Sequence, residues 1–197
     1  MADYEAERDR RLAFYSALMR EAGMPLEEVR LVDRARKQMG VFAAPVRPTG
    51  TTKDGETLRL GDEDWLVLHT PGHAEGLVCL YQPQRRLLLS SDHLLRDISS
   101  NPIVEPPEQE GTERPRQLVD YIRQLQRVAA LPVTWALPGH GRPVDDVPGL
   151  VARHLEFHRQ RGQEVLRTLE NGPRTPYEIS QLLFPRLDPV NASWRFP

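Results

Sequence analysis

The sequence predicts an α+β protein, and three features of its hydrophobic pattern support this fold class. Apolar residues recur at helical spacing through the first 40 residues. Short apolar runs separated by turn residues follow between residues 57 and 90, as expected for the strands of a sheet. After residue 112, helical patterns flank one further short apolar run.

The first 40 residues are expected to form two helices. Residues 2–22 form the first, an amphipathic helix that Gly23 ends. Pro25 opens the second helix, which stops at Gly40. A linker rich in Pro, Gly and Thr follows over residues 43–56.

Four strands and a long loop are expected in the middle of the chain. Gly61 and Asp62 turn the chain after the first strand, and residues 83–85 form the turn before the fourth. The polar, proline-rich residues 96–112 form the loop. The strands are expected at residues 57–60, 65–69, 77–81 and 86–90.

The last third of the chain is expected to be mainly helical. Its strand is cut short by Pro138 and Gly139. Thr175 is expected to cap a short final helix that runs through Leu183. The larger elements are a helix over 113–130, a strand over 133–137 and a helix over 148–170.

Composition narrows the classes of function. The formal net charge of the 197-residue chain is −2, which gives no overall electrostatic footprint for DNA. The single cysteine, Cys79, excludes an internal disulfide, and its strand-like surroundings favour a buried structural thiol. No apolar run approaches the ~20 residues of a membrane-spanning helix, and the charged start MADYEAERDRR is not a secretory signal. We therefore expect a cytoplasmic protein with no membrane partner.

Three of the predicted strands end in residues that bind metals. The strand at 65–69 leads into TPG and His73, the strand at 86–90 into Ser91 and Asp92, and the strand at 133–137 into PG and His140. Imidazole and carboxylate groups are suitable ligands for zinc or a similar transition metal. The glycines next to His73 and His140 allow the chain to turn tightly there. The pattern predicts a metal site at the edge of the sheet.

Each of these residues has a structural alternative. A single histidine or aspartate after a strand is more commonly a turn or capping residue, and the metal hypothesis depends on all three occurring together. A structural role is expected for the four other histidines of the chain. These are His69, expected to pack, His93, which follows Asp92 directly, and His154 and His158, which share a helix face.

The three strand ends together resemble known sequence motifs. TPGHAEG, LLLSSDHLL and LPGHGRPV occur in the order and spacing of the third, fourth and fifth motifs of the metallo-β-lactamase-fold hydrolases. The resemblance implies that His73 binds one metal ion, His140 a second, and Asp92 both. It further implies that Asp92 orients a bridging hydroxide that attacks an ester, thioester, amide or phosphodiester. Ser91 stands where many relatives carry Gly, a change that we expect to be tolerated.

The same resemblance implies the domain organisation. Residues 1–148 correspond to a partial αββα sandwich, its C-terminal half, with the helices at 2–40 as an insert and the sheet and helix at 57–148. Residues 149–197 resemble an incomplete winged-helix-like segment, found in a branch of broad hydrolases and RNA-cleaving members. Two zinc ions are the implied cofactor, with iron and manganese left open.

The first metal motif of that family, His-x-His-x-Asp-His, does not occur in this sequence. The three candidate ligands alone supply two protein ligands per metal ion, fewer than a stable zinc site usually has. We therefore expect the chain alone to bind metal weakly and to be a poor catalyst. We also expect one face of its sheet to present an apolar patch. The alternative to a hydrolase is a truncated, non-catalytic module that binds protein or RNA.

The sequence does not identify the substrate, which could be a small molecule or RNA, or the oligomeric state. The loop at 96–112 follows the candidate Asp92 and is expected to rim the pocket. A basic cluster on the second helix either holds an anionic substrate or is a solvated helix face. It comprises Arg30, Arg34, Arg36 and Lys37.

Overall fold

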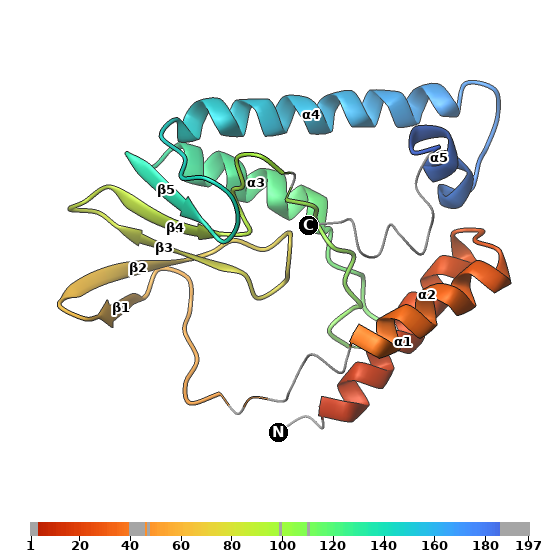
Figure 1. The fold of residues 1–197 in the computed structure, drawn as a ribbon, viewed down its shortest axis with the longest axis horizontal. Helices are drawn as coiled ribbons and strands as arrows, with labels where there is room; N and C mark the ends of the chain where they lie inside the picture. Colours follow the sequence, from red (N-terminus) through yellow and green to blue (C-terminus); the bar gives the residue numbers. More distant parts are fainter. Residues whose placement is uncertain (1–3, 40–45, 47, 99, 110, 186–197) are drawn as a thin grey trace. The chain divides into compact units, whose positions relative to one another are not determined.

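The computed structural model describes residues 4–39, 46, 48–98, 100–109 and 111–185 (Figure 1). This part of the chain forms five helices and one five-stranded sheet, which confirms the predicted α+β class. The elements are α1 (Tyr4–Glu21), α2 (Leu26–Met39), β1 (Thr57–Leu60), β2 (Glu63–His69), β3 (Val78–Gln82), β4 (Leu87–Ser91), α3 (Gln117–Ala129), β5 (Trp135–Pro138), α4 (Val147–Thr168) and α5 (Pro176–Leu183).

The chain divides into two compact units, residues 1–48 with 159–196 and residues 49–158. The first contains α1, α2, the end of α4 and α5, and the second contains the sheet, α3 and the start of α4. The domain boundary at residue 148 follows from a family resemblance and stays a prediction, as does the winged-helix-like character of 149–197.

The helical unit joins α5 to the turn between α1 and α2. The backbone N–H of Tyr177 donates to the carbonyl oxygen of Ala22 at 2.9 Å, and the Tyr177 hydroxyl donates to Glu28 at 2.7 Å. Thr175 caps α5 as predicted, because its side chain accepts from the backbone N–H of Glu178 while the Glu178 carboxylate accepts from the Thr175 backbone. One member of the predicted basic cluster, Arg36, has a structural contact. Its guanidinium group lies 4.1 Å from the centre of the Tyr15 ring on α1.

The order of strands in the sheet follows the order in the chain. β1, β2, β3 and β4 pair antiparallel with their neighbours, and β5 pairs parallel to β4. β2, β4 and β5 therefore run in the same direction and end at the same edge. All five strands lie within two residues of their predicted bounds.

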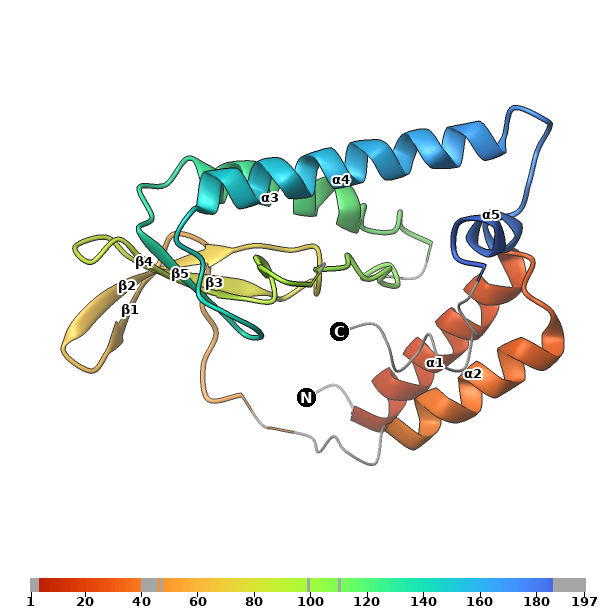
Figure 2. The same cartoon turned by 45° about the horizontal axis from the view of Figure 1, so that its top comes forward.

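One face of the sheet is covered by α3 and the start of α4, as Figures 1 and 2 show. Each fully buried side chain of the size of valine or leucine stabilises a fold by about 1.5–3 kcal/mol, compared with the same side chain left exposed. The Cys79 thiol belongs to this core, and burial raises its pKa to about 12, which confirms the predicted structural thiol. The core side chains are Leu68, Cys79, Tyr81, Leu88 and Ala136 from the sheet, Tyr121, Leu125 and Val128 from α3, and Val147, Leu150 and Val151 from α4.

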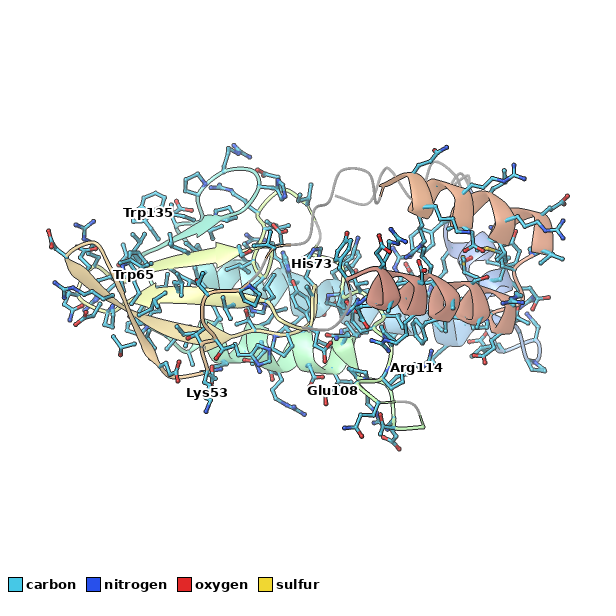
Figure 3. All side chains as sticks on the ribbon, turned by 90° about the horizontal axis from the view of Figure 1, so that it is seen from below. Lys53, Trp65, His73, Glu108, Arg114 and Trp135 are labelled. Atoms are coloured by element: carbon cyan, nitrogen blue, oxygen red, sulfur yellow. The ribbon has the colours of Figure 1, made fainter. Side chains whose placement is uncertain are left out.

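The opposite face of the sheet, seen from below in Figure 3, is also apolar. Strand register places Val67 opposite Leu80 and Leu80 opposite Leu89 on this face. Trp135 is 46% exposed and Leu137 is 37% exposed, in contrast to their fully buried neighbour Ala136. The expected apolar patch is thus present. Trp65 and Val67 lie on the same face but are buried, and the members of the patch are Leu58, Leu60, Leu80, Leu87, Leu89, Trp135 and Leu137.

α3 begins at Gln117, later than the predicted start at residue 113. Pro115 explains the difference, because a proline disfavours the helical conformation of the residue before it, here Arg114. The side chains of Gln117, Tyr121, Leu125 and Val128 are buried, at spacings that place them on one face of the helix.

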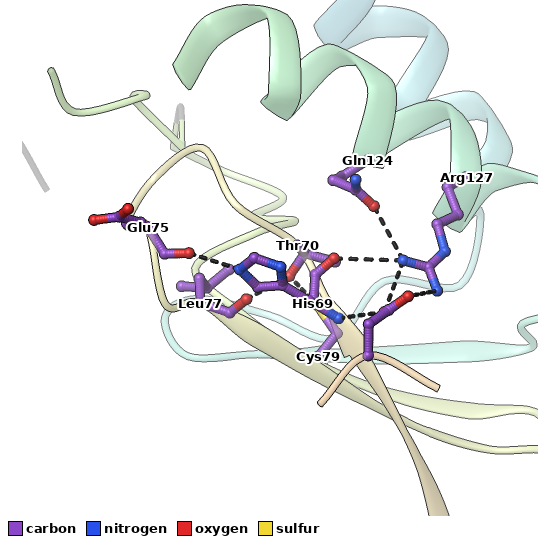
Figure 4. Close-up of polar contacts among 8 residues, drawn as sticks. His69, Thr70, Glu75, Leu77, Cys79, Gln124 and Arg127 are labelled. Atoms are coloured by element: carbon purple, nitrogen blue, oxygen red, sulfur yellow. Dashed lines mark hydrogen bonds and ion pairs between the residues drawn. The ribbon is translucent and has the colours of Figure 1, made fainter. Parts of the chain in front are cut away.

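A polar cluster ties α3 to the end of β2 (Figure 4). Arg127 binds both carboxylate oxygens of Asp54, at 2.9 and 3.1 Å, and this pairing holds the pKa of Asp54 below its usual value. Asp54 also accepts from the backbone N–H of His69 at 2.8 Å. The His69 ring bonds the carbonyl oxygen of Glu75 at 2.7 Å and is exposed, so the predicted packing role was wrong.

Within the described residues, no helix has both the length and the apolar composition that crossing a membrane requires.

Candidate metal centre

The turns that follow β2, β4 and β5 meet at one edge of the sheet. His73 lies in the turn after β2, Asp92 directly follows β4, and His140 follows β5. The backbone N–H of Gly139 donates to the carbonyl oxygen of Ser91 at 2.9 Å, which joins two of these turns. The structure therefore brings the three predicted ligands together.

Asp92 lies between the two imidazole rings. Its Oδ2 atom is 3.8 Å from Nε2 of His73, and its Oδ1 atom is 3.7 Å from Nε2 of His140. Both distances are too long for hydrogen bonds. Two ligand atoms that each lie about 2.1 Å from one zinc ion, at a tetrahedral angle, are about 3.4 Å apart. The two gaps are slightly wider than this, so each has room for a metal ion beside the carboxylate.

The orientation of His73 is fixed by the loop at 96–112. Its Nδ1 atom lies 3.1 Å from the carbonyl oxygen of Asn101. A carbonyl oxygen can only accept, so Nδ1 is the donor of this bond, and in a neutral ring Nε2, which faces Asp92, then has a free lone pair. A hydrogen bond from the second ring nitrogen to a carbonyl is the usual support of a metal-binding histidine.

The Oδ1 atom of Asp92 is buried, and within the described part of the chain no group donates a hydrogen bond to it. A buried carboxylate oxygen without a donor is costly unless a cation neutralises it. The side chains of His73 and Asp92 are 20% and 27% exposed, whereas that of His140 is 63% exposed. The site is therefore anchored at Asp92 and open at His140, and its residues fit a bound divalent metal.

Among the described residues, no group of three or more His, Cys, Asp or Glu side chains is arranged so that it could hold a metal ion. In the arrangement above, each candidate metal position is flanked by only one imidazole and one shared carboxylate. Two protein ligands are fewer than the three or four of a typical zinc site.

Gly139 is required by space and not by an unusual backbone conformation. A Cβ atom at this position would lie 2.7 Å from Oδ1 of Asp92. Any side chain there would push against the central carboxylate of the site. Gly139 does lie in a bend directly after β5, as expected, but because its φ is not positive, the space beside Asp92 is the stronger reason for a glycine here.

Gly72 is required both by space and by an unusual backbone conformation. Its φ of 145° lies in a region that other residues rarely adopt, and an added Cβ atom would lie 2.5 Å from Cβ of Tyr121. The contact seats the turn before His73 directly on α3. The backbone N–H of Ile103 also donates to the carbonyl oxygen of Gly72 at 3.1 Å.

Ser91 has a left-handed backbone conformation, with φ of 45°. The pairing of β4 with β5 is irregular between Leu89 and Ser91, so the chain turns sharply before Asp92. Glycine adopts this conformation without the steric cost that a serine has. The structure thus supplies a physical reason why a glycine would fit at this position.

A chain of polar groups supports the site from the core side, and no local pattern in the sequence indicates it. The Ser100 hydroxyl donates to the carbonyl oxygen of Asp92. Ser100 also lies beside the Tyr121 hydroxyl, where its hydrogen bond opposes the burial that raises the pKa of Tyr121. The Tyr121 hydroxyl bonds Nδ1 of His154 on α4 at 3.1 Å. These contacts link both core helices to the backbone of Asp92.

The remaining histidines near the site are structural, as predicted. His93 is fully buried edge-on against Tyr121, with ring centres 5.4 Å apart. Burial lowers the pKa of His93 to about 4, so the ring is neutral near pH 7. His158 also packs edge-on against Tyr121, at 5.7 Å, and burial lowers its pKa and that of His154.

Fold and site together define a class of protein: an α+β protein with a candidate metal centre at the ends of its strands. Residues 8–140 match the profile of the Metallo-beta-lactamase superfamily. The chain belongs to the metallo-beta-lactamase superfamily, which implies divalent metal binding.

Individual relatives agree with this assignment. The chain is 34% identical over 172 residues to "Probable metallo-hydrolase YqjP" of Bacillus subtilis (strain 168), covering 87% of this chain and 53% of that protein. It is 43% identical over 47 residues to "Acyl-coenzyme A thioesterase MBLAC2" of Bos taurus, covering 24% of this chain and 17% of that protein. The chain thus resembles metal-dependent hydrolases.

A crystal structure of a metallo-beta-lactamase family protein from Thermus thermophilus superposes with a TM-score of 0.72 and 32% identity. The match covers 86% of this chain and 52% of that one. The chain therefore spans about half the length of YqjP and of this structure.

Proposed function

We propose that the chain contributes His73, Asp92 and His140 to a binuclear zinc centre that hydrolyses a thioester. His73 and His140 would each bind one ion through Nε2, and Asp92 would bind both. Water molecules or a further polypeptide segment would complete each coordination shell. A pair of zinc ions in this position would lower the pKa of a water molecule enough to form a nucleophile near neutral pH.

One observation carries this proposal: the geometry of Asp92 between two imidazoles. Each carboxylate oxygen faces a different Nε2 atom at 3.7–3.8 Å, and His73 uses Nδ1, not Nε2, for its hydrogen bond to Asn101. A purely structural Asp92 would instead accept hydrogen bonds at both oxygens. Beyond binding metal, Asp92 would orient the attacking water, since its side chain separates the two metal positions.

The choice of a thioester rests on the substrate classes that superfamily membership allows and on the name of one relative. Superfamily membership alone is compatible with an ester, a thioester or a phosphodiester. The relative MBLAC2 is named an acyl-coenzyme A thioesterase. We therefore propose an acyl-coenzyme A as the substrate of this site.

The metal assignment is tested by zinc titration and elemental analysis of the purified chain beside a His73→Ala/His140→Ala variant. We expect weak, saturable zinc binding by the chain and none by the variant. The same titration with iron and manganese tests the identity of the metal. Equal metal content in both proteins would contradict the ligand assignment.

The reaction is tested by thioester hydrolysis with and without added zinc, beside an Asp92→Asn variant. We expect slow, zinc-dependent turnover that the variant loses. An ester and a phosphodiester in parallel assays test the substrate class. Turnover that survives either chelation or the substitution would contradict the mechanism.

One observation favours a second candidate, a non-catalytic module that binds another protein. The sheet face away from α3 and α4 carries exposed apolar side chains, including Trp135 and Leu137. Contiguous exposed apolar surface is typical of protein contact sites. Absence of turnover with any metal, together with binding of a protein partner that Trp135→Ser weakens, would favour this function over hydrolysis.

A further inference from the structure

A cavity of about 260 Å³ lies beside the candidate metal centre, between the segment that follows Asp92 and the start of α4. Its apolar walls are Ile98, Leu150 and Phe157. Its polar walls are Arg96, Arg153, His154 and Asp97. The cavity therefore combines cationic groups with an apolar surface that includes an aromatic ring.

The cavity and the metal centre share a wall. Arg142, which lies two residues beyond His140, donates to both carboxylate oxygens of Asp97, at 2.9 and 3.2 Å. A Cβ atom on Gly141 would lie 3.5 Å from the same carboxylate. The turn that carries His140 is thus tied to the cavity wall, so one extended ligand could occupy both places.

The charges of the cavity are unevenly compensated. Arg142 neutralises Asp97 and holds the pKa of that carboxyl below its usual value. Arg96 donates to the carbonyl oxygen of Pro143 and is 3.6 Å from the exposed carboxylate of Asp145. Arg153 makes no hydrogen bond or ion pair with any residue that the structure describes. An anion entering the cavity would therefore meet one unpaired guanidinium and one that is weakly paired.

We propose that this cavity binds the nucleotide part of the substrate, through its phosphate groups and its base. This part of the substrate does not react. One guanidinium group can donate two parallel hydrogen bonds to two oxygens of a phosphate, a geometry that a lysine cannot match. The half-exposed ring of Phe157 offers a surface on which a base can stack, at about 1–3 kcal/mol per base. Contacts to such a remote group would position the thioester at the metal centre.

This proposal rests on the proposed function and names the substrate feature that the site recognises. Its test needs neither zinc nor turnover. Adenosine 3′,5′-bisphosphate is titrated into the full, metal-free chain by isothermal calorimetry, beside Arg153→Ala and a control, Arg167→Ala. Arg167 is an exposed arginine of the same helix outside the cavity.

We expect saturable binding that Arg153→Ala weakens about tenfold, that Phe157→Ala also weakens, and that Arg167→Ala leaves unchanged. Circular dichroism checks that each variant is folded. If inorganic phosphate binds as tightly as adenosine 3′,5′-bisphosphate, the proposed contact between the base and Phe157 is overturned. If Arg153→Ala and Arg167→Ala lose the same affinity, binding is a non-specific charge effect and the cavity assignment is overturned.

The two proposals fail separately. Thioester hydrolysis without nucleotide binding would overturn the cavity proposal and leave the hydrolase intact. Nucleotide binding that depends on Arg153, in a chain that hydrolyses no thioester, would overturn the proposed function and leave the cavity assignment standing.

Discussion

The two faces of the sheet are both apolar, but they differ in what covers them. The face that contains Leu88 and Ala136 lies under α3 and α4, and both side chains are fully buried. On the other face, Trp135 and Leu137 flank Ala136 in the same strand and remain partly exposed. The comparison separates the residues that stabilise this fold by itself from those whose burial depends on a further contact.

The largest expected effect comes from neighbouring leucines on opposite faces of β4. Leu88→Ala should lower the free energy of unfolding by about 2–5 kcal/mol, because it leaves a cavity in the closed core. Leu89→Ala should cost about 1 kcal/mol, since its partly exposed side chain can be replaced by water. Urea denaturation followed by circular dichroism measures both. Equal losses would mean that the second face is as well covered in solution as the first.

A second pair of substitutions compares the two sides of the metal centre. Gly72→Ala should lower the free energy of unfolding by more than about 1 kcal/mol, because its φ is unfavourable and the new methyl group meets Tyr121. Gly139→Ala should have a smaller effect on folding but weaken zinc binding about tenfold, since it displaces the carboxylate of Asp92. Thermal unfolding and zinc titration of both variants separate the two effects. The interpretation fails if Gly72→Ala and Gly139→Ala both bind zinc as tightly as the unsubstituted chain.

Local signals in the sequence were sufficient for the strands and the candidate ligands. Alternating apolar residues and turn residues located all five strands, and each ligand follows the end of a strand. The direction of β2, β4 and β5 then brings His73, Asp92 and His140 to one edge, as the motifs implied. Whether these residues bind metal stays a prediction.

Contacts between distant segments could not be predicted in the same way. Within the helix predicted over residues 113–130, no local signal distinguishes Tyr121 from the other apolar residues, although it packs on Gly72 and bonds His154. Gly139 was predicted only as a turn residue, and its close approach to Asp92 could not be predicted because the two residues are distant in sequence. Such roles depend on which segments meet in space, and a single sequence shows this only where a motif fixes it.

The smallest expected effect concerns Ser91, at the point where both faces of the sheet end and the site begins. Its left-handed conformation should cost about 1 kcal/mol relative to glycine. Ser91→Gly removes this cost but also gives the unfolded chain more freedom. The net gain should be about 0.5 kcal/mol or less, with zinc affinity unchanged, as judged by urea denaturation and zinc titration. Ser90→Gly on the same strand is the control, because Ser90 is buried with ordinary φ and its hydroxyl donates to Leu94, so that change should destabilise. A loss of stability in Ser91→Gly as large as in Ser90→Gly would show that the serine side chain, and not the backbone conformation, determines what this position requires.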